Sequence, residues 1–136
     1  MARLVFVDSG VLIAAARGTD QVSERALEML EDPELSFASS PFVRLEVLPK
    51  PVYNRRPDEA EFYEEFFRAV TAWAEPNTEL VQAAYDEAVR AGLSALDALH
   101  VAAAAAVGAD ELLTREGRTK PIHRSTLVPV RTIAPG

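Results

Sequence analysis

The sequence contains no cysteine among its 136 residues. This absence excludes a disulfide framework, a zinc–thiolate site and a cysteine nucleophile. It suits a reducing compartment, and we expect a cytoplasmic protein. Histidine is almost as scarce, with two residues. A metal site in this chain would therefore be built mainly from oxygen ligands, which select Mg²⁺ or Mn²⁺ over zinc.

Long hydrophobic runs are also missing. The longest, from Val101 to Val107, is far shorter than the roughly 20 residues that a membrane helix requires. The apolar stretch near the N-terminus is broken at residues 8–10, so it does not have the pattern of a signal peptide. With 49% hydrophobic and 26% charged residues, the composition is that of a globular protein. We expect residues 1–136 to form one soluble domain without a membrane partner.

An excess of positive charge is lacking too, since 14 Lys and Arg residues face 21 Asp and Glu residues, a net charge of −7. Taken alone, this argues against a nucleic-acid partner. The charges are unevenly distributed along the chain, however. Residues 115–136 hold five basic side chains and one acid, and residues 44–56 hold four basic side chains and one acid. Two such islands could contact phosphates, while a solvated surface explains them equally well. The candidates for phosphate contact are Arg44, Arg55, Arg56, Arg115, Arg118, Lys120 and Arg124.

Short apolar runs alternate with helical patterns along the chain. This alternation predicts an α/β protein with a mainly parallel sheet. A Ser followed by Pro41 predicts a helix start, and Asp58 with Glu61 three residues later has the capping-box spacing. Prolines at 49 and 51 predict that the segment 50–57 is a basic loop. The expected strands are residues 4–7, 35–38, 111–114 and 128–133, and the expected helices are residues 10–16, 23–30, 41–48, 58–73, 78–91 and 94–107.

Four acidic residues stand where the edge of such a sheet would lie. Asp8 directly follows the first expected strand, and Glu116 follows the strand-like LLT. Asp97 falls in the first turn of the Ala-rich helix, and Glu46 lies inside the helix that starts at residue 41. Because parallel strands end at one edge, where open α/β folds place their sites, all four are candidates for one cluster.

Three of these acids also have a simpler explanation. Asp8 suits a helix N-cap, Asp97 complements a helix dipole, and Glu46 suits a solvated face. Together they would repel one another and raise their pKa values unless a cation lay between them. Two divalent ions held in this way can activate water and orient a phosphodiester. His100, one turn after Asp97, could face the same cleft, although a core histidine is the commoner case.

Three segments of the sequence resemble the PIN domain, and more narrowly the VapC-type toxin ribonucleases of bacterial and archaeal toxin–antitoxin pairs. They are VDSGVLIAAA, SSPFVRLEVL and LSALDALHVAAAAAVGADELLT, and the resemblance covers essentially the whole chain. It implies a three-layer α/β/α sandwich with a mainly parallel sheet of about five strands. It also implies hydrolysis of RNA with Mg²⁺ or Mn²⁺, an antitoxin that covers the cleft, and a homodimer.

The resemblance assigns roles to individual residues. Asp8, Glu46 and Asp97 match catalytic acids of the family that bind the metal. Ser9 matches the hydroxyl that follows the first acid and supports it. Many family members carry Asp two residues after a Thr, whereas this chain has Glu116 after Thr114. We expect Glu116 as the fourth catalytic acid, one methylene longer than usual, with Thr114 as a supporting hydroxyl.

Two other functions fit parts of the pattern. In the first, Asp8 is the nucleophile of a phosphoryl transfer, but such enzymes usually need a second acid where Gly10 stands. The second is a PIN-like module that binds RNA or acts as a scaffold and has lost catalysis, which the substitution at Glu116 would allow. The expected helix 58–73 also carries more large apolar residues than one stripe needs, which suits either a dimer interface or core packing.

Overall fold

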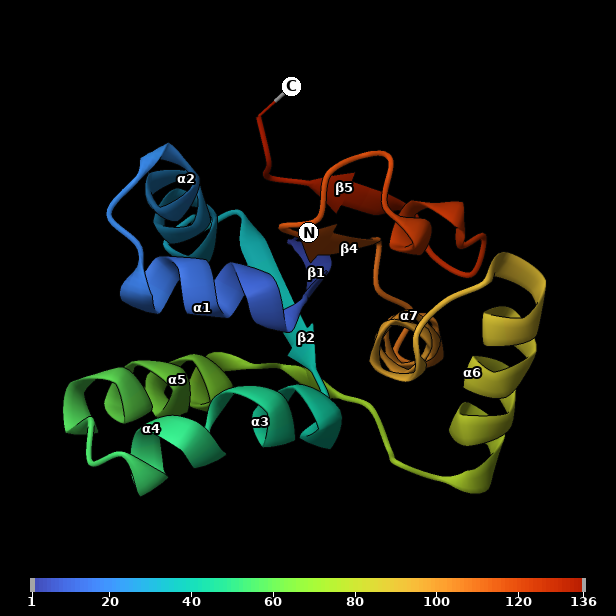
Figure 1. Ribbon diagram of the computed structural model, residues 1–136, viewed down its shortest axis with the longest axis horizontal. Helices are drawn as coiled ribbons and strands as arrows, with labels where there is room; N and C mark the ends of the chain where they lie inside the picture. Colours follow the sequence, from blue (N-terminus) through green and yellow to red (C-terminus); the bar gives the residue numbers. More distant parts are fainter. Residues whose placement is uncertain (1, 136) are drawn as a thin grey trace.

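Five parallel strands form the centre of the structure, a computed structural model that describes residues 2–135 (Figure 1). The strand order is β3-β2-β1-β4-β5, and every neighbouring pair is parallel. The expected α/β class with a parallel sheet of five strands is therefore confirmed. The strands are β1 (Arg3–Val7), β2 (Leu35–Ser39), β3 (Ala72–Trp73), β4 (Glu111–Thr114) and β5 (Val130–Thr132).

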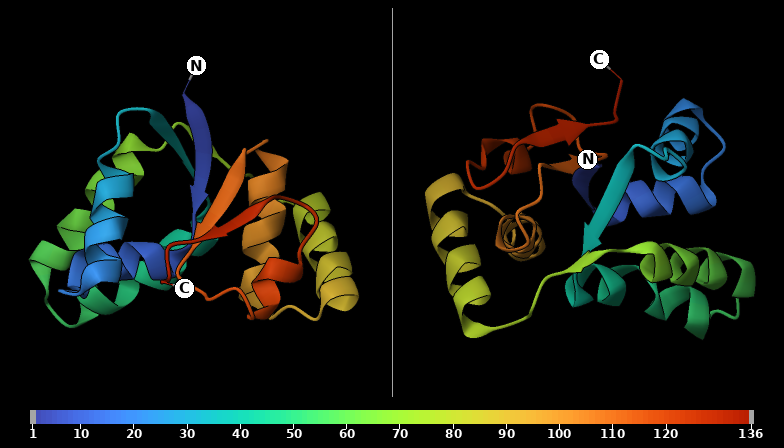
Figure 2. Two further views of the ribbon diagram at one scale, coloured as in Figure 1. Left: turned by 90° about the horizontal axis from the view of Figure 1, so that it is seen from above. Right: turned by 180° about the vertical axis from the view of Figure 1, so that it is seen from behind.

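Helices cover both faces of the sheet and complete the three expected layers. Helices α1, α2 and α5 lie on one side, and α6 and α7 lie on the other (Figure 2). No helix within residues 2–135 combines the length and the apolar character needed to cross a membrane. The helices are α1 (Ser9–Arg17), α2 (Gln21–Leu30), α3 (Pro41–Val47), α4 (Pro49–Tyr53), α5 (Pro57–Ala69), α6 (Thr78–Ala91) and α7 (Ala95–Ala106), followed by the 3₁₀ helix η1 (Pro121–Arg124).

The core explains why the two central strands are apolar at successive positions. Val5, Phe6 and Val7 of β1 are all fully buried, as are Leu112 and Leu113 of β4. A strand covered by helices on both faces has no solvent side and therefore no polar alternation. The alanines of α7 are small enough for this helix to pack closely on the sheet. The carboxyl ends of β1 and β4 are thereby held firmly side by side.

The expected basic loop at residues 50–57 is wrong at its start, because Pro49–Tyr53 forms the short helix α4. Pro49 is the first helical residue, where its fixed φ suits the helix and no N–H is needed. Pro51 also falls in the first turn, whose N–H groups have no partner within the helix. Proline interrupts the interior of a helix but is tolerated in its first turn, and both prolines lie in the first turn of α4.

The expected helix 58–73 begins one residue early and ends four residues early. Helix α5 starts at Pro57, its N-cap Arg56 makes no side-chain cap bond, and Asp58 lies in the first turn rather than at the cap. After Ala69 the backbone becomes extended, and Trp73 pairs with Ser39 as part of β3. A strand of two residues has no periodicity to detect, so it was not expected. Of the large apolar residues expected on this helix, Phe66 and Phe67 are packed in the core, Phe62 is half-buried, and Trp73 is 42% exposed.

The other boundaries follow their capping residues. Ser40 caps α3, Ser94 caps α7, and Gly92 ends α6 with φ of 69° in the left-handed region. Helix α2 starts two residues before its expected start, because Asp20 accepts a hydrogen bond from the amide of Ser23. The last strand is shorter than expected, at Val130–Thr132. These differences do not move the sheet edge at which the acids were expected.

Glu87 on α6 holds the segment after η1 against this helix. Its side chain is 4% exposed and accepts hydrogen bonds from Arg90 Nε at 2.7 Å and Arg90 Nη2 at 2.9 Å. It also accepts from Ser125 Oγ at 2.7 Å and from the amide of Thr126 at 3.0 Å. These bonds, with that from Arg90 the strongest, lower the pKa of Glu87 to about 2.

We predict that Glu87→Gln lowers the free energy of unfolding by about 2 kcal/mol at neutral pH. The folded pKa lies below the ordinary value of 4.5, so this stabilisation is complete above that pH and is lost as the pH falls towards 2. Urea unfolding at several pH values measures the difference between the two proteins. It should shrink steadily below about pH 4.5, whereas Asp86→Asn, at the exposed neighbour, should change little. A difference that does not vary with pH would contradict the assignment.

Candidate active site

One pocket of about 440 Å³ lies at the carboxyl edge of the sheet, where β1 and β4 end and α1 and α7 begin. The four acids expected at this edge all line it, although they come from four separate segments of the chain. The lining residues are Asp8, Ser9, Gly10, Ile13, Glu46, Leu96, Asp97, His100, Arg115 and Glu116.

Asp8 is at once the N-cap of α1 and a wall of this pocket. Its Oδ1 accepts a hydrogen bond from the amide of Ser9 at 2.8 Å, and its Oδ2 accepts one from Thr114 Oγ1 at 2.9 Å. The residue is 7% exposed. Burial raises the pKa of Asp8, while the nearby His100 ring and the two hydrogen bonds act against this rise. The capping and functional interpretations of Asp8 are therefore compatible.

Glu46 reaches the pocket from α3, where its side chain is 33% exposed. Its Oε1 accepts a hydrogen bond from Ser9 Oγ at 2.5 Å and lies 2.6 Å from His100 Nε2. The hydrogen bond with His100 is the main reason why the pKa of Glu46 lies below its usual range. Glu46 is thus an ionised carboxylate tied to the start of α1 and to α7.

Asp97 and Glu116 complete the acidic set. Asp97 lies in the first turn of α7, where its amide donates a hydrogen bond to the cap Ser94. Its pKa is raised by burial and then by the negative charge of Asp8, with a further contribution from Glu116. Glu116 is exposed, and its amide donates to Thr114 Oγ1 at 3.1 Å. The pocket therefore concentrates negative charge that a cation would relieve.

The donor chemistry of this pocket fits a divalent cation that prefers oxygen. Asp8, Asp97, Glu46 and Glu116 supply carboxylate oxygens, and hard cations such as Mg²⁺ and Mn²⁺ take such ligands. In the described part of the chain, however, no three His, Asp or Glu side chains are arranged to hold an ion together. The carboxylates face one pocket, and a preformed cage is absent from residues 2–135.

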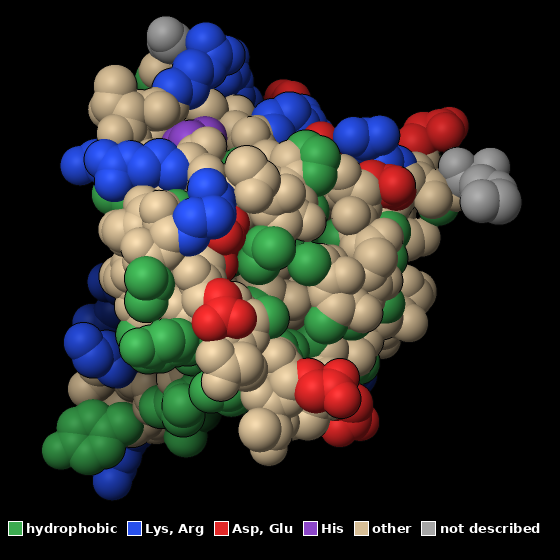
Figure 3. All heavy atoms as spheres, turned by 90° about the vertical axis from the view of Figure 1, so that its right-hand side faces the viewer, with side chains coloured by type: hydrophobic (Ala, Val, Ile, Leu, Met, Phe, Trp, Pro, Cys, Tyr) green, Lys and Arg blue, Asp and Glu red, His purple; other side chains and the backbone are tan. Residues whose placement is uncertain are grey.

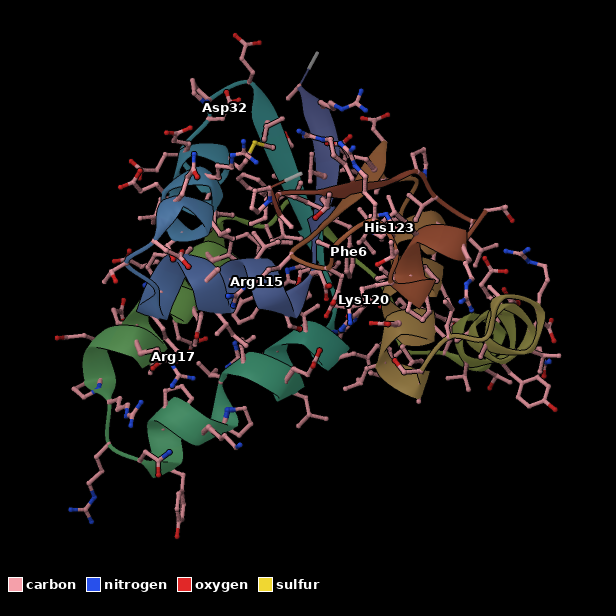
Figure 4. The ribbon with its side chains drawn as sticks, turned by 45° about the horizontal axis from the view of Figure 1, so that its top comes forward. Phe6, Arg17, Asp32, Arg115, Lys120 and His123 are labelled. Atoms are coloured by element: carbon pink, nitrogen blue, oxygen red, sulfur yellow. The ribbon has the colours of Figure 1, made fainter. Side chains whose placement is uncertain are left out.

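Of the seven basic candidates, Arg115 reaches the acidic pocket. It lines the pocket directly after β4, and Figure 4 shows it over α1. A Cβ added at Gly10 would meet the Cβ of Arg115 at 3.3 Å, so this close approach favours glycine at the start of α1. Lys120 also lies on the segment after β4 (Figure 4).

The other basic candidates lie further from the acids or have internal partners. Arg44 pairs with Glu64 at 2.6 Å, and Arg124 Nη1 donates to the carbonyl of Ala91. Arg118 borders a separate hollow with His123 and Arg131. On the face of the molecule drawn in Figure 3, several Lys and Arg side chains lie towards one edge. Arg55 and Arg56 are exposed between α4 and α5. Of these basic candidates, none but Arg115 is therefore among the described residues that line the acidic pocket.

A larger hollow, of about 590 Å³, lies over α3 and α4. Its lining is mostly apolar, including Leu45, Val52 and Tyr53, with Arg44 as its one charged residue. It therefore lacks the acid–base and metal-binding groups that line the smaller acidic pocket.

Sequence reasoning did not identify Ile13 or Leu96 as lining residues of the acidic pocket, nor the contact between His100 and Glu46. The spacing of three residues between Asp97 and His100 was a usable signal, because it places both on one face of a helix. The approach of Glu46 depends on how α3 packs between α1 and α7, with which it makes contact. No local pattern in the sequence specifies that packing.

Comparison with known proteins identifies the family. The family model of the PIN domain matches residues 5–122, which is most of the chain and includes all four pocket acids. None of the curated proteins compared with the chain matches it in sequence.

Solved structures with the same fold are distant in sequence. The chain is similar to VapBC2 from Rickettsia felis bound to a promoter DNA fragment, with a TM-score of 0.72, 13% identity, and coverage of 95% of this chain and 98% of that one. The chain is also similar to DNA-bound VapBC from Salmonella typhimurium, with a TM-score of 0.71 and 12% identity. This match covers 98% of this chain and 100% of that one. A third similar structure is VapC20 from Mycobacterium tuberculosis, described as a toxin that cleaves the sarcin–ricin loop. Its TM-score is 0.60 at 20% identity, and the match covers 79% of this chain and 86% of that one.

Proposed function

This chain belongs to the PIN domain family, and we propose that it is a metal-dependent endoribonuclease, the toxin of a type II toxin–antitoxin pair. The observation that carries the proposal is the meeting of Asp8, Glu46, Asp97 and Glu116 in one pocket. Carboxylates crowded at the edge of a sheet suit the binding of divalent cations and phosphodiester hydrolysis.

In this proposal Asp8 and Asp97 are the principal metal ligands, and Glu46 is a ligand directly or through water. The bound divalent ion would supply activation of a water molecule and polarisation of the phosphodiester. Thr114 Oγ1 and the amide of Ser9 hold the Asp8 carboxylate by one hydrogen bond to each oxygen. Asp8 is thereby fixed in orientation at the end of β1, as a ligand of a catalytic ion must be.

The remaining polar residues bind and support the substrate. Arg115 stands at the rim of the pocket and would contact an RNA phosphate next to the scissile bond. Lys120, on the same segment, would extend this contact along the RNA backbone. The amide of Glu116 itself donates to Thr114 Oγ1, the hydroxyl that holds Asp8. We assign Glu116 a role in metal or water binding at the outer side of the pocket.

The similar structures also support a protein partner for this chain. Two of the similar structures are VapBC complexes, which supports a cognate antitoxin as the partner of this chain. We propose that the antitoxin covers the acidic pocket, that the chain forms a homodimer, and that it acts on RNA in the cytoplasm.

A second candidate function is an RNA-binding or scaffold module without catalysis. One observation favours it, since no three acidic or histidine side chains within residues 2–135 are arranged around a common ion position. The retention of Asp8, Glu46 and Asp97 in one pocket favours the nuclease.

The test is cleavage of a labelled RNA by the purified protein with Mg²⁺ or Mn²⁺ and with EDTA. We expect internal cleavage with metal and a loss of about 100-fold or more on its removal. Because water rather than the ribose 2′-hydroxyl attacks, the products should carry no 2′,3′-cyclic phosphate. Cleavage that persists unchanged in EDTA, or binding of RNA without any cleavage, would reject the metal-dependent nuclease.

A further inference from the structure

His100 lies between two of the proposed ligands. Its side chain is 1% exposed, and Nε2 is 2.6 Å from Glu46 Oε1 and 3.8 Å from Asp8 Oδ1. The ring packs against Phe6 of the central strand, with the ring centroids 6.1 Å apart. A ring so enclosed has little freedom to move relative to the sheet. Any group that it holds is therefore fixed to the core of the domain.

The direction of the hydrogen bond follows from the chemistry of its partner. Glu46 Oε1 lies 2.6 Å from His100 Nε2 and also accepts a hydrogen bond from Ser9 Oγ. A carboxylate oxygen accepts hydrogen bonds, so the proton lies on His100 Nε2. The other ring nitrogen, Nδ1, is buried without a hydrogen-bond partner among the described residues.

This unpaired nitrogen argues against a purely structural role for His100. A buried polar atom without a partner costs folding free energy. An apolar side chain of similar size would pack against Phe6 without that cost. What such a side chain would lack is the Nε2–H group that reaches Glu46.

Glu46 needs such a donor because nothing in its own helix restrains it. It lies near the end of the seven-residue helix α3, and a free glutamate side chain has several rotatable bonds to order. The donors Ser9 Oγ and His100 Nε2 both bond to Oε1. No hydrogen bond from any residue between 2 and 135 reaches Oε2. One oxygen is thus anchored twice, and the other is left free.

We propose that His100 is a positioning residue that anchors Oε1 of Glu46 from the buried face of α7, so that Oε2 remains available to the divalent ion or to the attacking water. The inference rests on the proposed function for the role of Glu46. It adds that α7 provides both a ligand, Asp97, and, one turn later, the group that orients the ligand from α3. His100 acts through Glu46 and does not itself touch the substrate.

The test compares two substitutions of similar size. His100→Met removes the donor, and His100→Gln retains an N–H donor at a similar distance from the backbone. We expect His100→Met to lower kcat for RNA cleavage and to weaken Mn²⁺ binding, measured by calorimetry, each by about 10- to 100-fold. KM for RNA should change little, and Tm should be unchanged or higher. In His100→Gln, kcat and the affinity for Mn²⁺ should both return most of the way to their wild-type values. Wild-type kcat in His100→Met, failure of His100→Gln to recover function, or unfolding of His100→Met would each overturn the proposal.

Two further measurements isolate the contact with Glu46. In a Glu46→Ala background, adding His100→Met should cost less than about 2-fold, because the residues act as one unit. A further loss of kcat in this background as large as that caused by His100→Met in the wild type would overturn the proposal. In metal-free wild-type protein, ¹H–¹⁵N spectra should show a proton on His100 Nε2, and a ring whose Nε2 carries no proton would overturn the proposal. This last result does not depend on cleavage, so a wild-type protein that neither cleaves RNA nor binds Mn²⁺ would refute the proposed function separately.

Discussion

Replacing Asp8 by Asn is expected to reduce RNA cleavage by about 100-fold or more, with the fold retained. The change removes the negative charge and one metal-binding oxygen. The amide oxygen of Asn still accepts from the amide of Ser9, as Asp8 Oδ1 does. On the other side, the Thr114 hydroxyl can accept from the Asn side chain instead of donating to it. The cap of α1 therefore survives, while the proposed metal ligand is lost.

Initial cleavage rates and thermal unfolding of the two proteins test this result. Burial raises the pKa of Asp8, so the ionised carboxylate is costly in the metal-free fold, and the Tm of Asp8→Asn should match or exceed that of the wild type. Asp58→Asn is the matched control, because Asp58 is exposed in the first turn of α5 and should keep full activity. An Asp8→Asn protein that cleaves RNA at the wild-type rate would remove Asp8 from the site.

Replacing Asp97 by Asn is expected to cause a loss of the same size, about 100-fold or more, for a partly different reason. Asp97 is the acid whose pKa is raised by the charge of Asp8 as well as by burial. Without metal, the two carboxylates repel each other, and with metal they share a positive charge. Asn at this position relieves the repulsion but contributes much less to the binding of a cation.

The substitution should also change how the stability of the metal-free protein depends on pH. A raised folded pKa means that the folded protein binds more protons than the unfolded chain between 3.8 and the folded value. Stability therefore decreases as the pH rises through that window. Asp97→Asn should make this decrease smaller, leaving the part that comes from the raised pKa of Asp8. Unfolding in EDTA at several pH values measures it, with Asp58→Asn as the control. A marked destabilisation of Asp97→Asn at neutral pH would instead make Asp97 a structural residue of α7.

Much of this site could be predicted from local patterns. The apolar run Val5–Val7 ends at Asp8, and a buried parallel strand places its last residues at the sheet edge. Ser94 caps α7 by accepting from the amide of Asp97, so this acid had to lie in the first turn. The positions of both acids could be predicted from the sequence. Asp8 directly follows the apolar run that forms β1, and Asp97 lies three residues after the N-cap of α7.

What could not be predicted depends on contacts between segments far apart in the chain. Glu46 bonds to Ser9, 37 residues away, and to His100, 54 residues away. The two prolines at 49 and 51 suit a loop and the first turn of a helix equally well, and the packing of α4 against α3 and α5 decides between them. The same holds for β3, whose two residues become a strand through pairing with β2. Tertiary contacts supply this information.

Titration of Mn²⁺ into the metal-free protein, followed by calorimetry, measures whether the acidic pocket binds a divalent ion. We expect saturable binding to the wild-type protein, weakened by about 10-fold or more in Asp8→Asn and in Asp97→Asn, and unchanged in Asp58→Asn. Binding of equal strength in all four proteins, or no binding to the wild type, would contradict the assignment of these acids to a metal-dependent nuclease.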